Sequence, residues 1–79
     1  MKRILKTIDH RKWYHLETLK KFYNNYKIEC IEQNDAEGKQ FTFVIFKYLW
    51  REHAYMMHPK TKRIKFLTNE VYNEVNYVI

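Results

Sequence analysis

Hydrophobic positions in the first third of the chain recur at the spacing of a helix. Between about residues 10 and 26 the apolar side chains stand three or four positions apart and form one stripe; they are Trp13, Leu16, Leu19, Tyr23 and Tyr26. Asp9 precedes this stretch, and its carboxylate can accept hydrogen bonds from the free N–H groups of a first helical turn. The pattern therefore predicts an amphipathic helix over residues 10–26, with Asp9 as its N-cap and Asn24-Asn25 at its end.

After residue 26 the periodicity becomes that of strands. Residues 27–33 place a few apolar side chains among charges, which is typical of an edge or half-buried strand. A polar loop follows over residues 34–39, where Gly38 is the one residue free to adopt a positive φ. Residues 40–50 carry apolar side chains on both faces, and such a strand is usually central and covered on both sides.

Two more strands are expected before the C-terminal segment. Residues 53–58 alternate as a third strand, Pro59 begins a turn, and residues 63–68 alternate as a fourth strand. A competing interpretation makes residues 48–58 a helix that ends before Pro59, because proline cannot continue a helix.

Together these elements predict an α+β domain that spans residues 1–79. One N-terminal amphipathic helix packs on an antiparallel sheet of about four strands. Over residues 69–79 the valines fit a helical stripe behind an Asn69 cap, and they fit a strand equally well. Residues 1–8 fit either a short strand or a basic arm ahead of the helix.

The composition predicts a folded protein of a reducing compartment. Apolar residues make up 46% of the chain and aromatic residues 18%, whereas disordered chains are poor in both. Cys30 is the one cysteine, and a secreted domain of this size usually needs disulfides. No signal-peptide pattern is present, and the longest apolar stretch, residues 43–46, is far shorter than the roughly 20 residues of a membrane span. We therefore expect a soluble cytoplasmic protein with no membrane partner.

The net charge of +6 is unevenly distributed along the chain. Residues 1–27 and residues 39–65 each carry +6, whereas residues 28–38 carry −4 and residues 66–79 carry −2. Two basic blocks separated by an acidic segment predict an uneven surface field, which attracts polyanions or an acidic protein surface.

Aromatic and basic residues are interleaved in the second basic block, and this pattern predicts a nucleic-acid-binding surface. Flat rings stack on exposed bases at about 1–3 kcal/mol each, and cations neutralise phosphates. A basic hairpin over residues 60–65 can also grip a backbone or enter a groove. The residues expected to bind are Lys47, Trp50, Arg51, Tyr55, Lys60, Lys62, Arg63 and Lys65. Trp50 and Tyr55 would stack, and the affinity would fall steeply with salt.

The same residues also have a purely structural interpretation. The aromatic side chains fit a core under the C-terminal segment, and the lysines fit ordinary solvated surface. A second basic cluster fits either a solubilising N-terminus or an arm that reaches along a nucleic acid; it contains Lys2, Arg3, Lys6, Arg11 and Lys12.

The sequence predicts no cofactor and no metal site. His10 and His15 are five positions apart, as are His53 and His58, so neither pair shares one face of a helix or strand. The chain has no serine and a single glycine, which excludes a serine nucleophile and a glycine-rich phosphate loop. Cys30 is expected to be a small core residue.

Acid–base cleavage of RNA needs no cofactor, and Arg51, Glu52 and His53 carry suitable groups. Tyr55 lies close to them in sequence. In size, charge and expected fold the chain broadly resembles the small basic ribonucleases of toxin–antitoxin pairs. Because neighbouring strand residues alternate between faces, Arg51 and His53 share one face while Glu52 takes the other. This separation favours binding over catalysis.

We therefore predict a small basic binding module, not an enzyme, whose partner is nucleic acid. The alternative is a phage or mobile-element protein that binds a host protein, such as a defence or nucleic-acid-processing enzyme, because the residue types favoured at interfaces are abundant. The many Lys, Asn, Tyr and Ile residues, whose codons are AT-rich, fit an AT-rich bacterium or its phages. A toxin-like ribonuclease is the second alternative. A homodimer through the sheet or the C-terminal segment is compatible with either form of binding.

Overall fold

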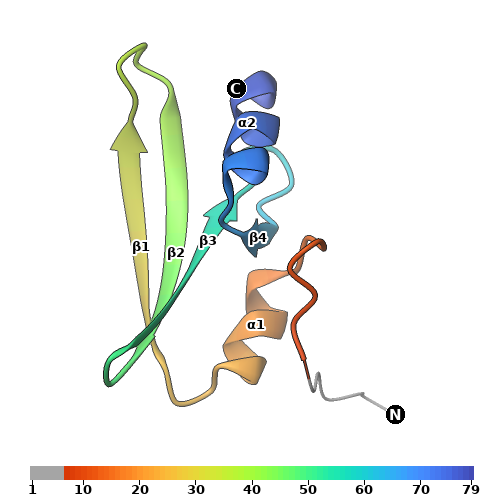
Figure 1. Ribbon diagram of the computed structural model, residues 1–79, viewed down its shortest axis with the longest axis vertical. Coiled ribbons are helices and arrows are strands. Elements are labelled where there is room, and N and C mark those ends of the chain that lie inside the picture. The colour runs from red at the N-terminus through yellow and green to blue at the C-terminus, as the bar shows by residue number, and fades with distance from the viewer. Residues whose placement is uncertain (1–6) are drawn as a thin grey trace.

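A helix, a four-stranded antiparallel sheet and a second helix follow one another along the chain, which confirms the α+β class (Figure 1). The computed structural model describes residues 7–79. The elements are α1 (Leu16–Phe22), β1 (Lys27–Asn34), β2 (Gln40–Tyr48), β3 (Arg51–Met57), β4 (Ile64–Phe66) and α2 (Asn69–Val78). The strands form a meander in the order β1-β2-β3-β4. Lys2, Arg3 and Lys6 of the expected basic arm lie outside the described residues.

The first helix is shorter than predicted because the chain before it pairs with the sheet. Tyr14 and Ile64 form an isolated antiparallel bridge, in which each backbone N–H donates to the other residue's carbonyl oxygen at 2.8 Å. An extended backbone at Tyr14 is incompatible with a helix, so α1 begins only after His15. The predicted helix over residues 10–26 is therefore wrong outside residues 16–22.

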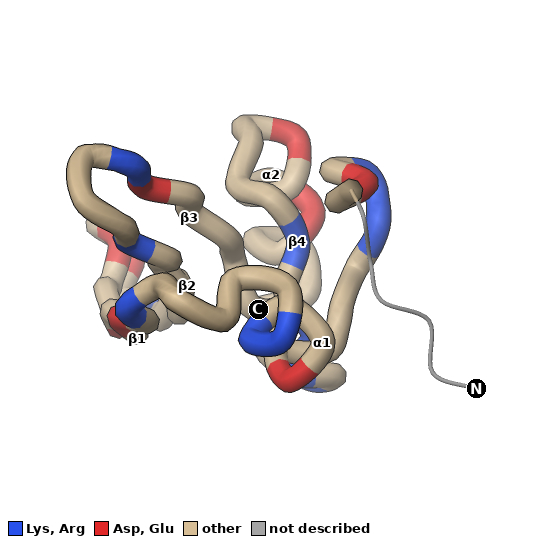
Figure 2. The backbone as a smooth tube through the Cα atoms, turned by 90° about the horizontal axis from the view of Figure 1, so that it is seen from below, with Lys and Arg blue, Asp and Glu red and all other residues tan. Residues whose placement is uncertain are grey.

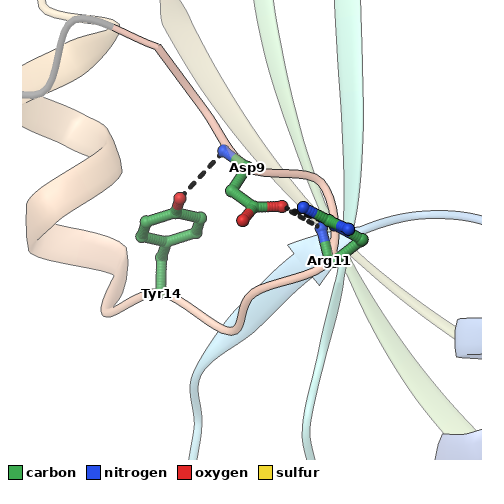
Figure 3. A network of polar contacts seen from close by, with 3 residues as sticks. All are labelled: Asp9, Arg11 and Tyr14. Carbon is green, nitrogen blue, oxygen red and sulfur yellow. Dashed lines mark hydrogen bonds and ion pairs between the residues drawn. The ribbon is translucent and has the colours of Figure 1, made fainter.

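Asp9 closes a local turn and does not cap the helix (Figure 3). Its Oδ1 accepts hydrogen bonds from the backbone N–H of Arg11 at 2.9 Å and from Arg11 Nε at 3.3 Å. The bond from the Arg11 backbone is the main cause that lowers the pKa of the Asp9 carboxyl. The backbone N–H of Asp9 donates to the Tyr14 hydroxyl at 2.9 Å, so the turn is tied to the residue that joins β4.

All four predicted strands are present, but their boundaries differ at the central turn and at β4, which spans only Ile64–Phe66 and not residues 63–68. β2 ends at Tyr48 and β3 begins at Arg51, so Leu49 and Trp50 form a two-residue turn. The prediction that this strand continues to residue 50 is therefore wrong. The sequence does not reveal the turn, because neither Leu49 nor Trp50 is a usual turn residue. The alternative helix over residues 48–58 is also wrong.

The outermost strand, β1, is more exposed than a half-buried strand. Only Ile31 is partly buried in it, and Cys30 is exposed, so the expectation of a core cysteine is wrong. The physical reason is that the helices cover β2, β3 and β4 but leave the sheet edge at β1 uncovered. Gly38 has a φ of 83° in the following loop, as predicted.

The ambiguous C-terminal segment is a helix. Thr68 caps α2, because its side-chain oxygen accepts a hydrogen bond from the backbone N–H of Val71 at 3.2 Å. Asn69 is the first helical residue and not the cap. Val71 and Val75, four positions apart, are the buried residues of this helix. Neither helix of residues 7–79 is long and apolar enough to cross a membrane.

The two helices cover opposite faces of the sheet. On the face covered by α1, the buried residues are Leu19, Tyr23, Val44, Phe46, Tyr55 and Ile64. On the face covered by α2, they are Phe41, Met56, Val71 and Val75. We call these the α1 face and the α2 face. Side chains alternate along a strand, so each residue of β2 and β3 belongs to one of the two faces. The predicted cover on both sides of β2 is confirmed.

Two tyrosines share a hydrogen bond inside the core of the α1 face. The hydroxyls of Tyr23 and Tyr55 are 2.7 Å apart, and both residues are buried. Burial is the main cause that raises the pKa of each phenol above its ordinary value of 10.0. The bond satisfies both hydroxyl groups, which allows these rings to lie in an apolar core.

This pair predicts a loss of stability at alkaline pH. Both pKa values are raised in the folded state. The two neutral phenols therefore contribute fully to the free energy of unfolding below about pH 10, and this contribution decreases above pH 10 as the tyrosines of the unfolded chain ionise. The expected decrease in the free energy of unfolding is up to about 1.4 kcal/mol per pH unit for each tyrosine. Urea unfolding at a series of alkaline pH values measures it. The Tyr23→Phe/Tyr55→Phe variant should show a shallower decrease, and equal slopes would contradict the assignment.

Candidate nucleic-acid interface

The eight residues predicted to bind nucleic acid do not form one surface. Trp50 and Arg51 lie at the turn between β2 and β3, with Lys47 close by on β2. The cations of the basic hairpin lie beyond the other end of β3; they are Lys60, Lys62 and Arg63. Figure 1 shows the two turns at opposite ends of β3, and a strand of this length spans about 20 Å.

Two of the predicted residues have structural roles. Tyr55 is fully buried, and its hydroxyl bonds to Tyr23, so its ring cannot stack on a base. Lys65 lies on the α2 face, where its Nζ is 3.6 Å from a carboxylate oxygen of Glu74 and 5.6 Å from the ring centre of Trp13. Lys65 therefore joins β4 to α2 and to the segment before α1.

Lys47 is also engaged with other side chains. Its Nζ lies 2.7 Å from a carboxylate oxygen of Glu29 on β1 and 3.6 Å from one of Glu52 on β3. The hydrogen bond to Glu29 is the main cause that raises the pKa of Lys47. This group of three charges lies across β1, β2 and β3 on the α2 face. A phosphate would have to compete with two carboxylates for Lys47.

The basic hairpin keeps its three cations exposed. The His58 ring organises its turn, because Nδ1 accepts hydrogen bonds from the backbone N–H groups of Lys60 at 3.1 Å and Thr61 at 3.3 Å. Within the described residues, no carboxylate pairs with Lys60, Lys62 or Arg63. Ile79, which is 41% exposed, lines a shallow pocket together with Pro59 and Lys62. No exposed aromatic ring lies in this turn, so it offers cations without a stacking surface.

The turn between β2 and β3 exposes large apolar side chains instead. Leu49 is 74% exposed and Trp50 is 82% exposed. Leu49 also has a φ of 54°, in the left-handed region that an ordinary side chain enters at a cost of about 1–2 kcal/mol. The first central residue of such a two-residue turn is a position that favours glycine. The chain therefore holds a strained turn that displays a leucine and a tryptophan to solvent.

Further rings lie beside this turn on the α1 face. The ring centres of Tyr26 and Tyr48 are 5.3 Å apart, and those of Tyr26 and His53 are 5.8 Å apart. Tyr48 pairs directly with Arg51 across the hairpin, so these two side chains share the face. We call this group the tip surface; it consists of Tyr26, Tyr48, Leu49, Trp50, Arg51 and His53.

The tip surface carries one arginine and no carboxylate. Arg51 is exposed, and no ion pair forms with it among residues 7–79. The acidic residues nearest in the sheet, Glu29 and Glu52, lie on the α2 face with Lys47. The strand residues at this end of the α1 face are Ile28, Phe46, Tyr48, Arg51 and His53, and none of them is acidic. The sheet thus separates an aromatic, basic face from an ion-paired one.

Charge alone would not identify this surface. In Figure 2, Lys and Arg positions lie on both sides of the molecule and beside Asp and Glu positions. The Lys and Arg of the two basic blocks, as far as they fall within residues 7–79, therefore do not gather on one face. Exposed rings next to an unpaired arginine distinguish the tip surface from the basic hairpin.

The groups considered for RNA cleavage are separated. His53 lies on the α1 face, where Tyr23 stacks against it with a ring-centre distance of 5.3 Å, while Glu52 points to the α2 face and pairs with Lys47. Among the described residues, no cluster of three His, Cys, Asp or Glu side chains has the geometry of a metal site.

Trp50 and Arg51 belong to the predicted nucleic-acid-binding set, whereas the other four residues of the tip surface were not predicted to bind. Tyr26 was assigned to the buried stripe of the first helix, and Leu49 to a strand face. His53 was considered for a metal site and for RNA cleavage, and Tyr48 lay within the strand predicted over residues 40–50. The two-residue turn, which no usual turn residue marks, brings the end of β2, the start of β3 and the start of β1 together.

Comparison with protein-family models, with curated proteins and with solved structures found no match to this chain. The candidate site therefore depends on the geometry described above.

The strain at Leu49 predicts a stabilising substitution. Leu49→Gly should raise the free energy of unfolding by about 0.5–1 kcal/mol, because glycine adopts a positive φ without steric cost and little buried contact is lost. Chemical denaturation of both proteins measures the difference. The matched control is Trp50→Gly, at a turn position with a negative φ, which should not stabilise. A destabilised Leu49→Gly variant would contradict the strain assignment.

Proposed function

We propose that this protein binds single-stranded nucleic acid through the tip surface and does not act on it as an enzyme. The observation that carries the proposal is Trp50, a tryptophan 82% exposed next to Tyr48 and an unpaired Arg51. Exposed rings stack on bases of any sequence, and an arginine beside them can contact phosphate or stack in turn.

Single strands fit this surface better than a duplex does. Rings at the end of a hairpin reach the faces of bases only where the bases are unstacked. The exposed cations of the β3–β4 turn lie at the far end of β3 and would contact only a longer strand. DNA and RNA are both acceptable ligands, because every base has a face on which a ring can stack.

The test is binding of fluorescent single-stranded DNA and RNA oligonucleotides, followed by anisotropy at several salt concentrations. Trp50→Ala should weaken binding about 10- to 100-fold, the equivalent of one lost stacking contact. Arg51→Gln should weaken binding and reduce the magnitude of the salt slope by about 0.7. The matched control is Tyr77→Ala, since Tyr77 is 93% exposed but lies on α2. This variant should bind the oligonucleotides with unchanged affinity.

A second variant separates the two ends of β3. Removal of the basic hairpin charges in Lys60→Gln/Lys62→Gln/Arg63→Gln should affect short oligonucleotides less than Trp50→Ala does. If only the triple variant loses binding, the basic hairpin is the interface and the tip surface is not. If wild type binds neither DNA nor RNA at low salt, the proposal is wrong.

A protein partner is the second candidate, and the exposure of Leu49 favours it. Leucine does not stack on bases, so nucleic-acid binding leaves its exposure unexplained. Tryptophan, tyrosine and arginine next to an exposed apolar side chain are typical of the centre of a protein–protein interface. The partner would be a host protein if the chain is a phage or mobile-element product. Nuclease-resistant capture of one stoichiometric protein, lost in both Leu49→Ala and Trp50→Ala, would support this candidate over nucleic acid.

A further inference from the structure

The outer edge of β1 is a long, unpaired strand edge. β1 has eight residues, and it pairs with β2 in a continuous register from Lys27 opposite Lys47 to Asn34 opposite Gln40. Within residues 7–79 no strand lies on its other side. Edge strands are usually protected by charged side chains, proline, a bulge or short length; β1 has charged residues but none of the other three.

The direction of each backbone group in β1 follows from the loop after it. The backbone N–H of Asp35 donates to the carbonyl oxygen of Lys39 at 2.9 Å, so the odd-numbered residues of β1 bond to β2. The even-numbered residues Ile28, Cys30 and Glu32 therefore direct their N–H and C=O groups outward. These groups form a ready ladder for another strand.

The opposite edge of the sheet differs, because a segment of the chain itself occupies it. Tyr14 exchanges two backbone hydrogen bonds with Ile64 of β4, each 2.8 Å long. Among residues 7–79, one edge of the sheet is therefore occupied and the other is open.

The side chains of β1 are complementary to a second copy of the same strand. In an antiparallel pair about a two-fold axis at Ile28, each Lys27 faces Glu29 of the second copy. Glu29 already lies 2.7 Å from Lys47 of its own chain, and the facing Lys27 would place a second cation beside the same carboxylate. Within one chain, by contrast, Lys27 faces Lys47, a like charge. Ile28, which is 38% exposed, would meet its own copy at the centre of the interface.

We propose that this protein forms a homodimer by antiparallel pairing of two β1 edges, centred on Ile28. The helices do not obstruct this edge, since they pack over β2, β3 and β4. In this register only residues 27–29 of the two strands face each other, because β1 begins at Lys27, so the paired stretch is short and the dimer is weak and reversible. The two-fold axis is perpendicular to the sheet, so both α1 faces lie on the same side.

Sedimentation over a wide range of protein concentrations tests the dimer. The wild-type mass should rise from the chain mass of 10.0 kDa towards twice that value. Lys27→Glu should weaken the dimer by about tenfold, because two attractive pairs become repulsive. The Lys27→Glu/Glu29→Lys double variant should restore it, and its thermal unfolding is measured too, because Glu29→Lys removes the contact with Lys47. Lys27→Glu should not impair folding, since it places a glutamate opposite Lys47, and thermal unfolding checks this.

Cross-linking tests the register. Two copies of residue 28 would be about 5.5 Å apart between Cα atoms, within disulfide range, so an Ile28→Cys/Cys30→Ser variant should form a disulfide-linked dimer under mild oxidation. In the same register the two copies of Cys30 are four strand positions apart, about 13 Å, which is too far for a disulfide. Wild-type Cys30 should therefore cross-link much more slowly than the variant.

Three results would overturn the proposal. They are a wild-type mass of 10.0 kDa at every concentration, a dimer whose dissociation constant does not change in Lys27→Glu, and cross-linking through Cys30 in preference to position 28. Nucleic acid is absent from all these experiments. Failure of the dimer is therefore distinguishable from failure of oligonucleotide binding.

Discussion

Both faces of the central β2–β3 hairpin are apolar, and two short helices are available to cover them. α1 covers Val44 and Phe46 on one face, while α2 covers Phe41 and Met56 on the other. The seven residues of α1 and ten of α2 do not extend over the whole hairpin. The uncovered end is where β2 turns into β3, and the rings of the tip surface remain exposed there. Incomplete cover of a two-faced sheet thus creates the candidate site.

The sheet also sorts charge by face. Side chains alternate along each strand, so Lys47 and Glu52 point to the α2 face and neutralise one another together with Glu29. Arg51, which directly precedes Glu52, points to the α1 face among aromatic rings. A chain of +6 net charge can therefore have a mixed surface overall and still present one small region that is basic and free of acids. The same alternation separates His53 from Glu52, so the groups once considered for RNA cleavage do not meet.

Much of the fold was predictable because alternation and periodicity are local properties. The strand positions, the loop with Gly38 and the double cover of β2 were recognised from the pattern alone. The helix over residues 10–26 was overestimated because a long-range bridge between Tyr14 and Ile64 competes with local helix formation. The turn at Leu49-Trp50 was missed because its residues have no turn preference; the pairing of β2 with β3 imposes it.

The sequence by itself determined the elements that depend on neighbouring residues: an amphipathic segment, four alternating strands, and the lack of a cofactor motif. Only the tertiary structure decided which aromatic residues are core and which are exposed. Tyr55 and Trp50 belong to similar sequence patterns, but one lies beneath α1 and the other at a turn that no helix reaches. Exposure depends on what other segments cover, and it cannot be read from a residue's own neighbours. The same reason applies to β1, whose open edge becomes evident only when the strand order is known.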